Sequence, residues 1–181
     1  MNTEGKASDL EVGAKNYSLA DQWILSKWQR TKASVMQHFE NYRFDLAAKE
    51  IYEFTWNEYC DWYLELSKPV LTSKDVSESA LRGTRYTLIH VLDEMLRVIH
   101  PIMPFITEEI WQMLAPLTNT DEKMLITCSY PAVDESNINT NIESHVEWIK
   151  TFIVGIRNIR GEMNISPRKP LSITLEDASD D

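Results

Sequence analysis

Residues 51–66 carry apolar and aromatic side chains along two neighbouring stripes, each with the spacing of an α-helix. One stripe contains Ile51, Phe54, Glu58, Trp62 and Leu66, and the other contains Tyr52, Trp56, Tyr59 and Tyr63. An amphipathic surface helix buries one stripe, whereas two adjacent stripes indicate a helix that is covered on most of its sides. We therefore predict a central helix here, within which Trp56, Tyr59, Trp62 and Tyr63 have structural roles.

The same periodicity recurs in other segments and predicts an all-α fold, an antiparallel helix bundle. We expect main helices at residues 19–39, 44–67, 79–100 and 139–161, and a short helix at residues 104–114 packed across one end. Ser18 and Asp21 have the spacing of a capping box at the start of the first helix. Pro69 is expected to end or kink the second helix.

The chain is predicted to comprise three parts. Residues 1–17 lack a hydrophobic period and are expected to be a disordered tail or linker. Residues 18–161 form the bundle. In residues 162–181, the run Leu171–Leu175 alternates as a strand does, and a lone strand leaves its edges unpaired. We therefore expect this part to be the start of a truncated α/β appendage. The run Met124–Cys128 is also strand-like.

The formal net charge of −10 argues, taken alone, against a nucleic-acid-binding protein. The charge is nevertheless uneven, because residues 13–36 hold four cations against one carboxylate, as do residues 157–170. Two cysteines give no disulfide framework and suit a reducing, cytoplasmic compartment. No apolar run approaches the roughly 20 residues of a membrane span, so no membrane partner is expected.

The sequence contains no arrangement typical of a catalytic or metal site. No Glu is followed three residues later by His, and neither a Gly-x-Gly-x-x-Gly run nor a phosphate-binding Gly-Lys-Ser/Thr run occurs. We therefore assign no catalytic residue, no metal ligand and no cofactor to this chain.

A candidate binding row lies on the first helix, beside its core stripe. Trp23, Lys27, Arg30 and Ser34 are spaced by four, three and four residues, so they share one helix face. An aromatic ring with two cations suits stacking on an unpaired base and contact with its phosphates. The competing interpretation is that Trp23 packs on a neighbouring helix and the cations are solvated.

Five blocks of sequence, in order, resemble the anticodon-binding helical domain of the class I tRNA synthetases for valine, isoleucine and leucine, the valyl enzyme above all. They are Leu19–Ser26, Tyr42–Ala48, Tyr52–Pro69, His100–Trp111 and Ile156–Pro167. One departure is Gln22, where that family usually has Arg.

The resemblance implies a tRNA(Val) anticodon-loop recognition domain of a bacterial valine–tRNA ligase, which charges tRNA with valine using ATP and Mg. The fragment itself would be non-catalytic, and its partners would be the tRNA and the catalytic, editing and coiled-coil domains of the same full-length, monomeric chain. Candidate tRNA-binding residues are Trp23, Lys27, Arg30, Arg85, Arg157, Arg160 and Arg168.

Two alternatives stay open at this point. The first is the corresponding domain of an isoleucyl- or leucyl-tRNA synthetase. The second is a helical protein-interaction module with no role in RNA binding, which predicts apolar patches without basic neighbours.

Overall fold

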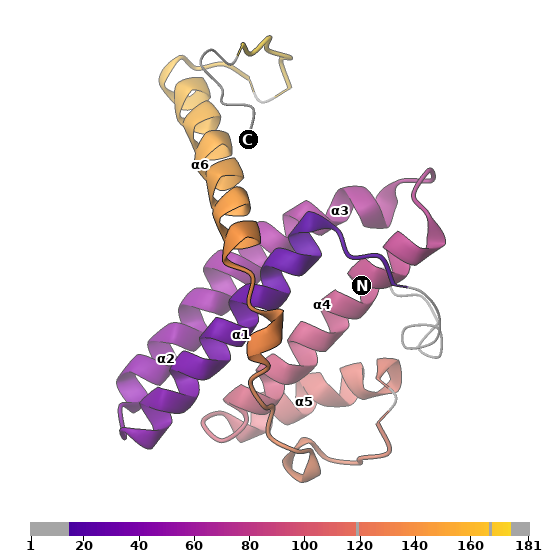
Figure 1. The fold of residues 1–181 in the computed structure, drawn as a ribbon, viewed down its shortest axis with the longest axis vertical. Helices are drawn as coiled ribbons and strands as arrows, with labels where there is room; N and C mark the ends of the chain where they lie inside the picture. The colour runs from indigo at the N-terminus through magenta and orange to yellow at the C-terminus, as the bar shows by residue number, and fades with distance from the viewer. Residues whose placement is uncertain (1–14, 119, 167, 175–181) are drawn as a thin grey trace. The chain divides into compact units, whose positions relative to one another are not determined.

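The computed structural model describes residues 15–118, 120–166 and 168–174, and these residues form helices and connections without a β-strand (Figure 1). They fall into two compact units, one reaching to Ser144 and the other starting at His145. The all-α fold predicted from the sequence is confirmed.

The first unit contains α1 (Leu19–Glu40), α2 (Phe44–Glu53), a π-helix η2 (Phe54–Tyr63), α3 (Leu64–Thr72), α4 (Glu78–Ile99) and α5 (Pro104–Leu114). Short 3₁₀ turns follow at η3 (Ala115–Leu117), η4 (Leu125–Thr127) and η5 (Glu135–Asn137), and the last helix is α6 (Thr140–Glu162). The segments α2, η2 and α3 are continuous, because the residues at their junctions keep right-handed helical dihedrals.

The start of α1 is fixed by the capping box that its sequence predicts. Ser18 accepts from the Asp21 backbone N–H, while the Asp21 carboxylate accepts from the Ser18 N–H and hydroxyl at 2.9 and 2.7 Å. The same carboxylate, which is fully buried, also accepts from Tyr63 Oη at 2.6 Å and from Thr84 Oγ1 at 2.8 Å. One side chain therefore joins α1, η2 and α4.

The central helix is α1, which corrects the prediction that the second helix is central. In α1 the buried residues follow almost every direction around the axis: Asp21, Trp23, Ile24, Ser26, Trp28, Gln29, Thr31, Lys32 and Val35. In the second helical segment Tyr59 and Tyr63 are buried as expected, but Tyr52 and Trp56 are 62% and 52% exposed, and Trp62 is half-buried. The pattern of apolar residues indicated the wrong central helix, because many of the buried residues on α1 are polar and hydrogen-bonded.

A buried ion pair joins the middle of α1 to α4. Lys32 is 1% exposed, and its Nζ lies 2.8 Å from Glu94 Oε2 and 2.8 Å from the Ala132 carbonyl. Trp28 Nε1 donates to the same Glu94 oxygen at 2.7 Å. A buried charge is costly unless it is paired, so loss of Glu94 would leave the Lys32 ammonium buried without its counter-ion.

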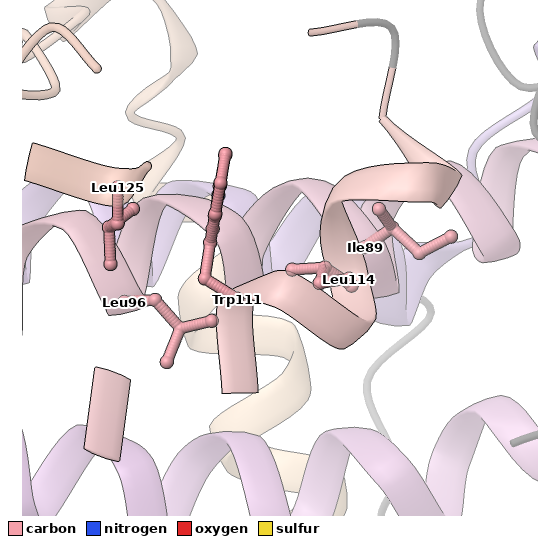
Figure 2. Packing of buried hydrophobic residues seen from close by; sticks show 5 residues of the cluster. All are labelled: Ile89, Leu96, Trp111, Leu114 and Leu125. Carbon is pink, nitrogen blue, oxygen red and sulfur yellow. The ribbon is translucent and has the colours of Figure 1, made fainter. Parts of the chain in front are cut away.

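Helix α5 packs on the C-terminal half of α4 around a separate apolar cluster (Figure 2). Its buried members are Ile89, Leu96, Trp111, Leu114 and Leu125. Trp111 Nε1 donates to Asp93 Oδ1 at 2.9 Å, so the buried indole is satisfied. The α5 bounds match the sequence prediction.

Three local predictions need correction. Pro69 does not end the second helical segment, which continues to Thr72, and the Pro69 carbonyl accepts from the Ser73 N–H at 3.1 Å. The strand-like run Met124–Cys128 instead contains the 3₁₀ turn η4. No strand forms at Leu171–Thr174, where a pairing strand is lacking among the described residues, and Leu175 lies outside them.

The N-terminal strap, residues 15–18, crosses α4 at a glycine. Asn16 N–H donates to the Ser79 carbonyl at 3.1 Å, and Lys15 Nζ lies 3.4 Å from the centroid of the Tyr86 ring. A Cβ on Gly83 would collide with the Asn16 backbone carbonyl. The close crossing therefore requires glycine at this position.

We expect Tyr63→Phe to destabilise the fold by ~1–3 kcal/mol, because it leaves the Asp21 Oδ1 atom buried without its donor. Burial and then the Asp21 charge raise the pKa of Tyr63, consistent with a neutral hydroxyl that donates. Urea denaturation measures the effect, with Tyr52→Phe as an exposed control. An unchanged midpoint would show that the hydroxyl does not hold this network.

We expect Gly83→Ala to lower the thermal midpoint, because the added Cβ would collide with the Asn16 carbonyl. Alanine alone favours a helix interior by about 1 kcal/mol over glycine, so the collision has to outweigh that gain. The matched control is Gly155→Ala in α6, where nothing lies within 4 Å of the added carbon. Limited proteolysis should cut the N-terminal strap faster in the Gly83 variant only. A Gly83→Ala protein at least as stable as Gly155→Ala contradicts the close crossing.

Candidate nucleic-acid interface

The structure does not support the stacking role predicted for Trp23. Its side chain is 0% exposed, so the indole has no face available to a base in this conformation. Arg30, which belongs to the same row, is already engaged within the protein. Its Nε donates to both oxygens of Glu143 at 2.9 Å, and its Nη2 donates to Thr140 at 2.9 Å. The competing interpretation, in which Trp23 packs, is favoured.

Lys27 and Gln22 have different surroundings from those expected. Lys27 is half-buried and lines a hollow of about 230 Å³ together with Glu50, Glu53 and Glu58. These carboxylates reduce the positive potential that a phosphate would meet. Gln22 Nε2 donates to the Tyr17 carbonyl at 3.1 Å and is therefore part of the turn that enters α1.

The other candidate arginines lie on different elements. Arg85 is half-buried on α4, whereas Arg157, Arg160 and Arg168 belong to the second unit. Arg160 donates to the carbonyls of Ser166 and Lys169 at 2.8 and 2.9 Å, which closes the turn after α6. Arg157 and Arg168 are exposed. Contact of these residues with tRNA stays a prediction.

Two helix–helix turns lie at the same end of the first unit. Asp21 contacts Thr84, and Lys32 contacts Glu94, so α1 and α4 run parallel. Helix α1 ends eight residues beyond Lys32, at Glu40, and α4 ends five residues beyond Glu94, at Ile99, which is about 12 Å and about 8 Å along the two axes. The α1–α2 turn and the α4–α5 turn follow directly. Both turns lie at the lower end of the bundle in Figure 1.

This end exposes apolar side chains, which we call the end surface: Tyr42 (81% exposed), Phe44 (56%), Ile102 (43%), Met103 (50%), Phe105 (91%) and Ile106 (49%). Large exposed apolar side chains gathered at one end of a domain are a reason to look for a binding site there. Sequence reasoning missed it because the search for stacking groups was confined to the first helix. The signal was present in the turns themselves, in Tyr42-Arg-Phe44 and Pro101–Phe105.

The α1–α2 turn holds its aromatic rings in a defined arrangement. Tyr42 has φ 57°, a left-handed conformation that few non-glycine residues adopt. The Tyr42 and Phe44 ring centroids lie 6.4 Å apart at 82°, and Phe39 lies 6.0 Å from Phe44. Arg43 forms two hydrogen bonds to Asp45 at 2.9 and 2.8 Å, which lower the pKa of Asp45 to about 2. The turn therefore presents exposed rings beside an Arg43–Asp45 ion pair.

The α4–α5 turn has its own side-chain support. His100 Nδ1 lies 2.8 Å from Thr107 Oγ1, and the Thr107 hydroxyl donates to the Met103 carbonyl at 2.8 Å. Proline at the first position of α5 suits the helix start. Aromatic rings presented on such turns can stack on unpaired bases, because every base offers a π-face. In the part of the chain that the structure describes, no group of three or more His, Cys, Asp or Glu residues could hold a metal ion.

Comparison with known proteins agrees with a tRNA-binding class. Residues 21–175 match the model of a family described as the anticodon-binding domain of tRNA ligase, and the chain belongs to this family. It is also 50% identical over 175 residues to the valine–tRNA ligases of Legionella pneumophila strains Lens and Paris. These alignments cover 97% of this chain but 19% of each relative, so the chain spans about a fifth of their length.

Among the described residues, no helix is long and apolar enough to cross a membrane.

We expect Trp23→Ala to destabilise the domain by ~3–5 kcal/mol, as truncation of a fully buried aromatic residue does. Trp56→Ala, at a half-exposed position on the second helical segment, is the control and should cost much less. Thermal and urea denaturation of both variants measure the difference. Equal stability of the two variants would restore Trp23 as a candidate for base stacking.

Proposed function

We propose that this domain binds the anticodon loop of tRNA(Val) through the end surface, as part of a bacterial valine–tRNA ligase. The observation that supports it most directly is the concentration of exposed rings and apolar side chains on two rigid turns at one end of the unit. Sequence-specific RNA recognition targets unpaired bases, because the major groove of A-form RNA is too narrow for side chains. A rigid helical scaffold also positions such groups more accurately than a mobile loop.

The parent enzyme would join valine to tRNA using ATP and Mg in the cytoplasm, as a monomer. Catalysis would reside in domains outside this chain, and the fragment itself would not catalyse. The relatives that are 50% identical over nearly all of this chain are valine–tRNA ligases, which favours the valyl enzyme over the isoleucyl and leucyl ones. The bundle would end near residue 161, and residues 162–181 would begin the α/β appendage.

Phosphate contacts would add to base stacking. Lys27, Arg30, Arg85, Arg157, Arg160 and Arg168 are candidates for that role, and Arg30 and Arg160 would exchange contacts within the fold for contacts with phosphate. The net charge of −10 is compatible with the proposal if affinity arises from several domains of the longer enzyme acting together.

The test is binding of a fluorescently labelled tRNA(Val) anticodon stem–loop to the 181-residue chain, followed by anisotropy. We expect Tyr42→Ala and Phe105→Ala to weaken binding by ~1–3 kcal/mol each, the range for loss of one stacked base. Tyr52→Ala is the matched control, because it removes an exposed ring from the side of α2.

Thermal midpoints of the three variants should stay close to that of the unmodified chain, since all three side chains are largely exposed. If Tyr52→Ala weakens binding as much as the other two, RNA does not bind at the end surface. If the unmodified chain binds an unrelated protein partner but no RNA, the protein-interaction alternative replaces this proposal.

A further inference from the structure

The α4–α5 turn exposes several apolar side chains, and part of its backbone is held by side-chain hydrogen bonds. Met103 precedes a proline, which restricts its conformation, and it occupies the cap position of α5 with φ −132° and ψ 65°. No side-chain cap bonds to that helix start. Backbone hydrogen bonds from Ile102 and Met103 N–H to the Ile99 carbonyl hold the first half of the turn. The second half depends on what binds the Met103 carbonyl.

That carbonyl is held by Thr107, whose side chain is almost fully buried at 2% exposure. The Thr107 N–H and hydroxyl both donate to it, at 3.3 and 2.8 Å. The same hydroxyl lies 3.2 Å from the Pro104 carbonyl and 2.8 Å from His100 Nδ1. When the hydroxyl proton goes to the Met103 carbonyl, an Nδ1–H on His100 can donate to the hydroxyl oxygen, so the three groups form one connected set.

The relay of His100, Thr107 and Met103 consequently fixes the peptide from which two side chains of the end surface project. Met103 and Phe105 lie on either side of Pro104, so rotation at Met103 changes the direction of both. A turn that samples several conformations must be ordered on binding, and ordering a residue opposes association. A turn that is already ordered avoids this cost.

We propose that His100 and Thr107 are positioning residues for RNA binding, which preset the α4–α5 turn in its binding conformation without touching the RNA. This inference rests on the proposed function of the end surface. It gives His100 a role through its hydrogen bond to the Thr107 hydroxyl.

The experiment compares His100→Phe, which keeps a flat ring but removes the donor, with His100→Asn, whose amide can place an N–H near the Nδ1 position. Anisotropy with the anticodon stem–loop is measured at a temperature where each variant is folded. We expect His100→Phe to weaken binding about five- to thirtyfold, in keeping with the cost of ordering one residue, and His100→Asn to bind within about twofold of the unmodified chain.

A second variant, Thr107→Val, removes the hydroxyl at nearly constant volume and guards against loss of folding in His100→Phe. It should weaken binding to a similar extent, and the double variant should add little, because both substitutions break one relay. Additive losses overturn the inference.

The remaining outcomes are also decisive. Failure of the unmodified chain to bind RNA rejects the proposed function and this inference together. Normal binding by His100→Phe rejects the positioning role alone. If His100→Asn loses as much as His100→Phe, restoring an N–H near the Nδ1 position does not restore binding, and the role through Thr107 is rejected.

Discussion

The carboxylate of Asp21 is the interaction on which the arrangement of the first unit depends. A fully buried carboxylate is tolerated only when its oxygens have donors, and here the donors come from the turn before α1, from η2 and from α4. Three segments that are distant in sequence must therefore meet at one point. Further along α1, Lys32 and Glu94 repeat the principle with opposite charges. Polar groups thus determine how the helices align, while the apolar clusters fill the space between them.

The sequence predicted where most of the helices begin and end, but not which of their residues are buried. Capping residues and periodicity placed α1, α4, α5 and α6 within a residue of their observed bounds, because these signals are local. Which helix is central could not be read in the same way. Gln29 and Lys32 look like surface residues in the sequence, and they are buried because partners from distant segments satisfy them.

The candidate site shows the same division between local and long-range information. Trp23 was chosen from a helical row, and its burial depends on contacts that no spacing rule contains. The rings of Tyr42 and Phe44 and the apolar side chains after α4 were visible in the sequence, but their common location follows from the parallel course of α1 and α4. A site assembled from two turns some 60 residues apart becomes recognisable only once the pairing of Asp21 with Thr84 is known.

The N-terminal strap gives the first unit a mechanical property. The strap crosses α4 near Gly83, at the end of the unit opposite the end surface, and α1 extends from it for 22 residues, or about 33 Å. A rigid rod of that length acts as a lever arm, so a tilt of roughly 5° at the strap moves the far tip by about 3 Å. Because the Asp21–Thr84 and Lys32–Glu94 contacts tie α1 to α4 at two levels, such a tilt requires α4 to move with α1, and the two turns of the end surface would then shift together.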